Sequence, residues 1–185
     1  MKFWARPIAI LLLSTAVALP FGPPQKADPF VQLKEATPLP KRLDPAYQFR
    51  KTKLLYIGDA IGPRRAGGFT GGVIRDEAIT FEGAYRLYGA VTELDKRQRF
   101  GSYFDFFWRT RRDGPVTVRL EYRQLNLREF AQAREVTYPD GSGSHRTEFQ
   151  VIGDDFFADG RVTSWRCLLI ANGAIVAEHD SFLWR

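Results

Sequence analysis

Apolar and polar residues alternate along much of the chain beyond residue 50. In PVTVRLEYRQ, residues 115–124, every second residue from Val116 to Tyr122 is apolar, and the residues between them are polar or charged. Because successive side chains of a strand point to opposite faces, this period of two predicts a strand with one buried face. Counted from Tyr85, seven apolar-rich stretches are predicted to be strands, at residues 85–91, 101–110, 115–124, 132–138, 146–152, 161–171 and 174–184.

Turn-forming residues separate several of these stretches. Asp113-Gly114, the PDGSGS segment at 139–144 and Asn172-Gly173 are the residue types that tight chain reversals require. We therefore predict three hairpins, over residues 101–124, 132–152 and 161–184.

The last hairpin contains a conflict between its two strands. A two-residue turn at Asn172-Gly173 sets Leu169 opposite Val176 and Cys167 opposite Glu178. The face that holds Cys167 and Leu169 is apolar, yet it would then also hold an acidic residue. We therefore predict that the second strand bulges or leaves the core before residue 178.

Seven short strands with turns between them, within about 100 residues, predict an all-β fold. The expected architecture is an immunoglobulin-like or fibronectin-like β-sandwich of about seven antiparallel strands. A small β-barrel is the alternative, with EAITFEG at 77–83 as an eighth strand, because a barrel has the same pattern and no open edges. The segment 125–136 is predicted to be a bridging loop with some helical character.

The N-terminal part of the chain has a different composition. Residues 1–18 combine two cationic residues, a short apolar run and the small-residue sequence AVA, which predicts a signal peptide cleaved after Ala18. The alternative is an uncleaved anchor, with membrane contact confined to residues 1–21. Residues 19–50 hold seven of the eleven prolines and are predicted to be an extended linker. Residues 51–185 are then a single domain with a Gly-rich loop at 62–72.

The charge balance favours some partners over others. The chain has 27 Lys and Arg against 21 Asp and Glu, a formal net charge of +6, with the two signs interspersed. Interspersed charge and predicted export both weaken the case for nucleic acid. We therefore expect a periplasmic, cell-surface or secreted protein, non-catalytic, that binds a protein or a glycan of the cell envelope. Self-association through edge strands is a further alternative.

An Arg- and aromatic-rich face is the candidate binding surface. If the hairpin 101–124 forms, the outward side chains of its two strands line one exposed face. Arginine and aromatic residues are enriched where proteins bind partners. The predicted binding residues are Tyr103, Phe107, Arg109, Arg111, Arg119 and Arg123.

Residues suited to catalysis are few. His145 follows a turn, and His179 lies in AEHDS, where strand alternation separates it from the acids on either side. The neighbouring residues of this stretch therefore do not form a Ser-His-Asp triad by themselves. A hydrolase-like enzyme of unrecognised type, the alternative to a binding protein, would have to combine His179 with Asp154 or Asp155.

Two further features each have a structural and a functional interpretation. Asp154, Asp155 and Asp159 lie in GDDFFADG, predicted to be a loop, and their carboxylates could bind calcium, although the spacing does not match a known calcium loop. Turn formation is the favoured interpretation, and no other cofactor is predicted. The single cysteine, Cys167, cannot form an intramolecular disulfide, and its apolar neighbours predict a buried thiol.

Overall fold

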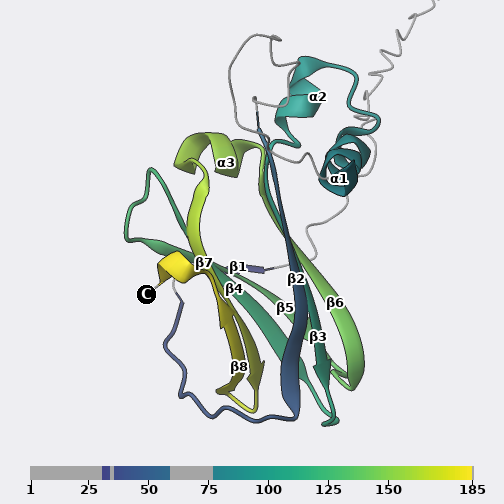
Figure 1. Cartoon of the computed structure of the whole chain (residues 1–185). Helices are drawn as coiled ribbons and strands as arrows, with labels where there is room; N and C mark the ends of the chain where they lie inside the picture. Colours follow the sequence, from purple (N-terminus) through teal and green to yellow (C-terminus); the bar gives the residue numbers. More distant parts are fainter. Residues whose placement is uncertain (1–30, 34–35, 59–76, 185) are drawn as a thin grey trace, which may run out of the picture.

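The computed structural model of the protein describes residues 31–33, 36–58 and 77–184 (Figure 1). The predicted signal peptide and the predicted Gly-rich loop lie outside the described residues. The elements are β1 (Val31–Leu33), β2 (Tyr47–Ile57), α1 (Glu77–Leu87), α2 (Glu93–Arg97), β3 (Gly101–Thr110), β4 (Val116–Gln124), β5 (Ala131–Tyr138), β6 (Gly143–Ile152), α3 (Asp154–Asp159), β7 (Val162–Ala171), β8 (Ala174–Asp180) and the 3-10 helix η2 (Phe182–Trp184).

The strands form two antiparallel sheets with a shared apolar interior (Figure 1). One sheet has five strands in the order β1-β5-β4-β7-β8, and the other has three in the order β2-β3-β6. The α-helices α1, α2 and α3 are short and lie between strands in the chain, and the 3-10 helix η2 follows β8. The prediction of an all-β fold is therefore confirmed.

Aromatic side chains fill the space between the sheets. Trp165 of β7 contacts Phe104 and Phe106 of β3, with ring centroids 6.1 and 5.4 Å away. Trp108 is almost fully buried and donates from Nε1 to Thr147 Oγ1 at 2.9 Å, so its polar edge is satisfied inside the core. The apolar residues that alternate along the strands are thus the ones that face the interior.

Two of the three predicted hairpins are wrong. β3 pairs with β2 and β6, whereas β4 pairs with β5 and β7, so the chain changes sheets at Asp113-Gly114. β5 and β6 also belong to different sheets, and residues 139–142 connect them. Turn residues reverse the chain, but they do not determine whether the next strand joins the same sheet or the facing sheet, about 10 Å away.

The third predicted hairpin is present, with the predicted bulge and a different register. β7 pairs with β8 across Asn172-Gly173. The register shifts after Leu169, which lies opposite Ala177 because Val176 is an extra residue in β8. The predicted pairing of Leu169 with Val176 is therefore wrong by one residue.

The bulge decides which way the end of β8 faces. Cys167 lies opposite His179 instead of Glu178, and Glu178 lies opposite Leu168. Residues directly opposite each other share a face of the sheet, so His179 turns toward the sandwich interior and Glu178 turns outward. This removes the conflict between an apolar inner face and an acidic strand end.

A helix occupies a region where strands were predicted. α1 spans Glu77–Leu87, so the predicted strand at 85–91 and the possible strand at 77–83 are both wrong. Phe81, Tyr85 and Tyr88 are spaced by four and three residues, which is the spacing of one helix face. In so short a stretch some of the apolar residues also fit the period of two that is typical of a strand, so the helical spacing alone did not identify the helix.

Part of the predicted linker 19–50 belongs to the sandwich. β1 pairs with β5, and β2 begins at Tyr47. Between these strands, residues 40–44 run beside the outer edge of β8. Proline is tolerated at the edge of a sheet, so a Pro-rich composition does not exclude this arrangement. The predicted bridging loop is also shorter than expected, since β5 begins at Ala131.

A buried polar network joins α3 to both sheets. The Arg134 guanidinium, in a residue that is only 3% exposed, donates from Nε to Tyr122 Oη at 3.0 Å, to the Gln150 carbonyl oxygen and to the Asp155 carboxylate. The Tyr122 hydroxyl donates to Gln132 Oε1 at 3.0 Å, and burial raises the pKa of Tyr122. Burial strengthens hydrogen bonds of this kind, and the bond from the buried Arg134 to the half-exposed Asp155 holds α3 against the strands.

Candidate functional site

The six residues predicted to form one binding face lie on opposite faces of the sandwich. Tyr103 and Phe107 alternate with core residues of β3 and point outward from the three-stranded sheet. Arg119 and Arg123 point outward from β4 of the five-stranded sheet. Their predicted common face depended on the hairpin 101–124, which does not form, so the expectation of a single surface is wrong.

On the three-stranded sheet, Tyr103 is engaged within the protein. Tyr103 is 4% exposed, its hydroxyl donates to the Arg99 carbonyl oxygen at 2.7 Å, and the Arg86 guanidinium lies 4.5 Å from its ring centroid. Burial raises the pKa of Tyr103 to about 12. Arg109 and Arg111 are exposed near the end of β3.

On the five-stranded sheet, the predicted arginines also have partners in the protein. Arg119 is buried and donates from Nε to the Glu135 carboxylate at 2.5 Å. The Arg123 guanidinium lies 4.4 Å from the centroid of the Trp184 ring and donates to the Trp184 carbonyl oxygen at 3.2 Å. These contacts hold the chain end against the sheet.

The three predicted calcium ligands lie on a helix. Asp154 and Asp155 form the first turn of α3 and Asp159 ends it, so the predicted loop is wrong. Asp155 pairs with Arg134, and Asp159 Oδ2 accepts from Gln132 Nε2 at 3.0 Å. Across the described ranges, no three His, Cys, Asp or Glu side chains are grouped as metal ligands would be. Two of the three carboxylates therefore hold α3 on the sheets.

His145 and Cys167 take part in packing. His145 stacks on Trp108, with ring centroids 4.5 Å apart, and its Nε2 donates to the Ser142 carbonyl oxygen at 2.8 Å. Cys167 is fully buried, and burial raises the pKa of its thiol well above the ordinary value. A thiol of this kind is a poor nucleophile because its thiolate form is disfavoured.

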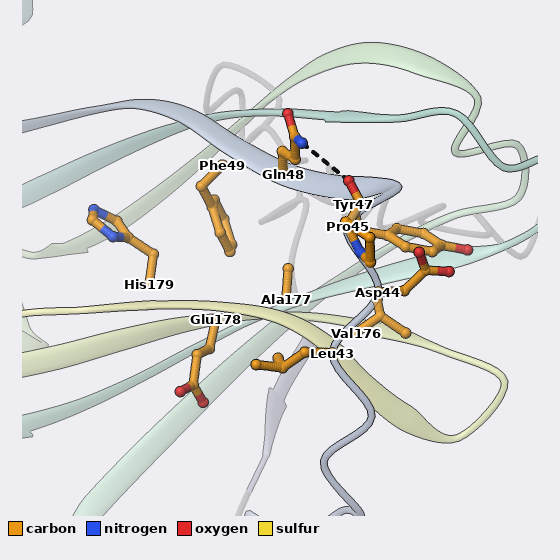
Figure 2. A pocket seen from close by; sticks show the side chains of 10 residues that line it. All are labelled: Leu43, Asp44, Pro45, Tyr47, Gln48, Phe49, Val176, Ala177, Glu178 and His179. Atoms are coloured by element: carbon orange, nitrogen blue, oxygen red, sulfur yellow. Dashed lines mark hydrogen bonds between the residues drawn. The ribbon is translucent and has the colours of Figure 1, made fainter.

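His179, by contrast, lines a groove of about 520 Å³ at one edge of the sandwich (Figure 2). The groove lies between β8, the edge strand of one sheet, and β2, an edge strand of the other. Three segments line it, at residues 43–45, 47–49 and 176–179. It is therefore built where the two sheets separate and where the chain passes from one to the other.

The turn at Asp44-Pro45 creates this groove. Before the turn the chain is hydrogen-bonded to β8: Ile175 N donates to the Pro40 carbonyl oxygen at 2.9 Å, and Asp44 N donates to the Val176 carbonyl oxygen at 2.9 Å. Asp44 Oδ1 then accepts from Ala46 N at 2.8 Å, which is how Asp stabilises a turn through its own backbone. Gln48 Nε2 donates to the Pro45 carbonyl oxygen at 3.0 Å (Figure 2). After Val176, β8 is therefore no longer hydrogen-bonded to the backbone of residues 40–44, and it borders the groove instead.

Aromatic rings support His179 inside the groove. Its ring centroid lies 5.8 Å from that of Phe49 and 5.4 Å from that of Trp165. Phe49 in turn contacts Phe106 edge to face at 6.1 Å. The side chain is placed by the bulge in β8 and oriented by the edge of the core, while the residue itself remains exposed.

The groove has an acidic lining. Asp44 and Glu178 are both among its lining residues, although the Glu178 carboxylate points to the outer face of β8, away from His179 (Figure 2), and no Lys or Arg is among the residues that line it. Cations lie at its border: Lys41 forms an ion pair with Glu178, and Arg112 Nε lies 3.5 Å from Asp44 Oδ2. The arrangement offers an apolar floor, the Asp44 carboxylate and an imidazole, with the Glu178 carboxylate on the outer side of β8, to an occupant with basic and apolar groups.

The acids proposed as catalytic partners of His179 are not part of this groove. Asp154 and Asp155 are not among its lining residues. Asp155 is bound to Arg134 of β5, and β4 and β7 lie between β5 and β8 in the sheet. The expected combination of His179 with these acids is therefore wrong.

Six of the ten residues that line the groove lie in the predicted linker, so the sequence did not indicate this part of the site. Residues 43–49 were assigned to the Pro-rich segment on composition. The alternation in AYQFRK, with Tyr47 and Phe49 apolar and Gln48 and Arg50 polar, was the available signal for a strand that begins at Tyr47.

In comparisons with known proteins, no family model, curated protein or solved structure matches the chain. None of the helices in the described ranges has the length and apolar character needed to cross a bilayer.

Proposed function

We propose that the protein is an exported, non-catalytic binding module of the cell envelope, which holds an extended segment of a partner protein in the groove between β2 and β8. One observation carries this proposal: residues 40–44 already pair with the outer edge of β8, with a parallel bridge between Lys41 and Ile175. This edge therefore accepts an extended chain. The groove begins where that pairing stops, so an added strand would continue it.

An immunoglobulin-like or fibronectin-like architecture is part of the proposal. Seven strands, β2 to β8, make up most of the two sheets. One sheet is formed by β2, β3 and β6, which are the first, second and fifth of the seven. The other contains β5, β4, β7 and β8, which are the fourth, third, sixth and seventh. In constant-type immunoglobulin domains the fourth strand joins the first, second and fifth, whereas here it pairs with the third, as in fibronectin type III modules. Such sandwiches are common in cell-surface proteins, which is a fold-level analogy in support of a binding role.

The proposed location has its support in residues 1–18, with their cationic start, apolar run and AVA sequence. The protein would then work in the periplasm, at the cell surface or outside the cell. Because a single cysteine cannot form an intramolecular disulfide, the stability of the domain would depend on the aromatic core between the sheets.

The lining residues indicate the chemistry of the occupant. An extended peptide alternates its side chains, so one set would contact Phe49 and Ala177 and the other would reach Asp44 and Glu178. Lys41 shows the type of group that Glu178 binds, since it forms an ion pair with that carboxylate. We therefore expect a segment in which apolar and basic residues alternate.

A titration with a model peptide tests this function. The probe is a blocked hexapeptide of alternating valine and lysine, added to ¹⁵N-labelled protein while backbone amide shifts are recorded by NMR. Shift changes are expected at residues 47–49 and 177–179. The matched peptide of alternating valine and glutamate should bind more weakly, because it meets carboxylates of its own sign.

Two charge reversals on β8 provide the matched comparison. Glu178→Lys should weaken binding of the Val-Lys peptide by about two- to fivefold, the range of a single partly exposed ion pair. Asp180→Lys, on the same strand but outside the groove lining, should leave the affinity unchanged. Shift changes that cluster away from the groove, or equal effects of the two variants, would contradict the proposal, as would binding of chitotetraose at these amides without binding of the peptide.

A further inference from the structure

The helix α1 presents its apolar side to solvent and its charged side to the protein. Phe81, Tyr85 and Tyr88 are 74%, 71% and 83% exposed, and their spacing places them on one helix face. Arg86 lies toward β3 and β6, and Glu82, four residues earlier, pairs with Arg86 and lies 4.0 Å from Lys53 of β2. A surface helix normally turns its apolar face to the core, so α1 is inverted.

Ion pairs hold α1 in this orientation. Arg86 pairs with Glu148 of β6 and lies 3.7 Å from Asp105 of β3, while its guanidinium covers the Tyr103 ring at 4.5 Å. Burial lowers the pKa of Arg86, but the hydrogen bond and charge of Glu148 outweigh burial and raise it. Rolling the helix to bury its aromatic residues would break all of these contacts. The exposed face is thus a consequence of how the helix is anchored.

The exposed residues continue beyond the helix. Val91 is 84% exposed and Leu94 is 65% exposed. The position of Leu94 is set by α2, where Thr92 Oγ1 accepts from Asp95 N at 3.1 Å and Asp95 Oδ2 accepts from Thr92 N at 2.9 Å. We call the exposed apolar set the residues Phe81, Tyr85, Tyr88, Val91 and Leu94.

The size and charge of this surface indicate what covers it. Five large side chains with most of their area exposed offer roughly 650 Å² per chain, so two copies would bury about 1,300 Å², within the ~1,200–2,000 Å² of specific interfaces. Residues 77–99 contain four acids and four bases. A segment without net charge gains little from an anionic lipid surface, and two copies of it do not repel each other.

From this we infer that the exposed apolar set is the contact of a symmetric homodimer, in which the α1 helices of two copies lie against each other. A two-fold axis lets the same aromatic residues supply both sides of the interface. Tyr85, which lies between Phe81 and Tyr88 in the exposed apolar set, lies closest to the axis. The dimer leaves the groove between β2 and β8 open, because the contact residues are not among its lining residues.

Sedimentation equilibrium of the full chain tests the dimer. At roughly 100 µM, above the micromolar Kd that an interface of this size supports, the chain should sediment at twice its own mass. Tyr85→Glu should weaken the association by at least about 50-fold, since it places a charge in the centre of the contact. Phe182→Glu, at a residue that is 86% exposed on η2, is the matched control and should change nothing.

A crosslink gives a second readout, because it traps associated copies covalently. Cys167 is the only cysteine and is fully buried, so Tyr85→Cys adds the one accessible thiol. A short bis-maleimide should join two copies of this variant, and the Phe182→Cys variant should remain uncrosslinked. A monomer at all concentrations would overturn the inference. Binding of phosphatidylglycerol vesicles by a monomeric chain, lost in Tyr85→Glu, would overturn it in favour of a membrane surface.

Discussion

Replacing Arg86 with methionine should detach α1 from the three-stranded sheet. Methionine replaces the apolar stem of the side chain and removes the guanidinium, and with it the ion pairs with Glu148 and Asp105 and the contact with the Tyr103 ring. Asp105 keeps a partner, because Arg146 Nη2 lies 2.8 Å from its Oδ1.

The magnitude follows from these contacts. A charge-assisted hydrogen bond contributes about 1.5–3 kcal/mol and a partly buried cation–π contact about 1 kcal/mol, less the screening of Glu148, so the loss is about 2–3 kcal/mol. A helix of 11 residues is marginal on its own, so this loss should open the helix locally while the sandwich stays folded.

Hydrogen exchange measures this opening directly. A loss of about 2–3 kcal/mol corresponds to exchange that is about 30- to 150-fold faster at the amides of α1, with protection in β3 and β6 retained. Arg109→Met, the same substitution at an exposed arginine of β3, is the control and should change neither region. Unchanged protection of α1 in Arg86→Met would refute the view that these ion pairs anchor the helix.

Three other outcomes follow from Arg134, Glu148 and Cys167. Arg134→Met should lower the stability of the whole sandwich by about 2–3 kcal/mol in urea unfolding, because it empties the network under α3, while Arg111→Met should stay within about 0.5 kcal/mol. Burial raises the pKa of Glu148, but hydrogen bonds from Arg86 and Gln150 and the charges of Arg86 and Arg146 outweigh it and lower the pKa. The ionised form of Glu148 therefore stabilises the docking of α1 at pH values above its unfolded pKa of about 4.3, and this stabilisation is lost as the pH falls through the lower pKa of the folded state. Between about pH 5 and 3, hydrogen exchange of α1 in the native chain should report this loss of protection. The Glu148→Gln variant should not show it. The Cys167 thiol should react with a disulfide reagent at the rate of global unfolding, and reaction as fast as that of a free thiol would show that β7 and β8 open locally.

The strands were predictable from sequence because burial on one face leaves a period of two. Val116 to Tyr122 and the aromatic residues of β3 show that pattern, and both stretches are strands with those residues in the core. The pairing of strands was less predictable, because Asp113-Gly114 has the chemistry of a hairpin turn and yet connects two sheets. Local turn chemistry does not contain the long-range information that assigns a strand to a sheet.

The candidate site was only partly predictable for the same reason. His179 was singled out from the sequence, but its direction depends on the single extra residue Val176, and a shift of one residue moves a side chain to the other face. The predicted Arg and aromatic face failed because Tyr103 and Arg119 belong to different sheets. The inverted orientation of α1 depends on Arg86 meeting acids from two distant strands, which no local pattern records.

The central claim, that the edge of β8 receives an extended peptide in the groove, is tested most directly by intermolecular NOEs between the Val-Lys hexapeptide and ¹⁵N-labelled protein. We expect contacts between peptide backbone protons and residues 177–179, in the order of a strand parallel to β8, as in the pairing of residues 40–44. Contacts along the outer edge of β6, or a peptide that runs antiparallel to β8, would contradict the account.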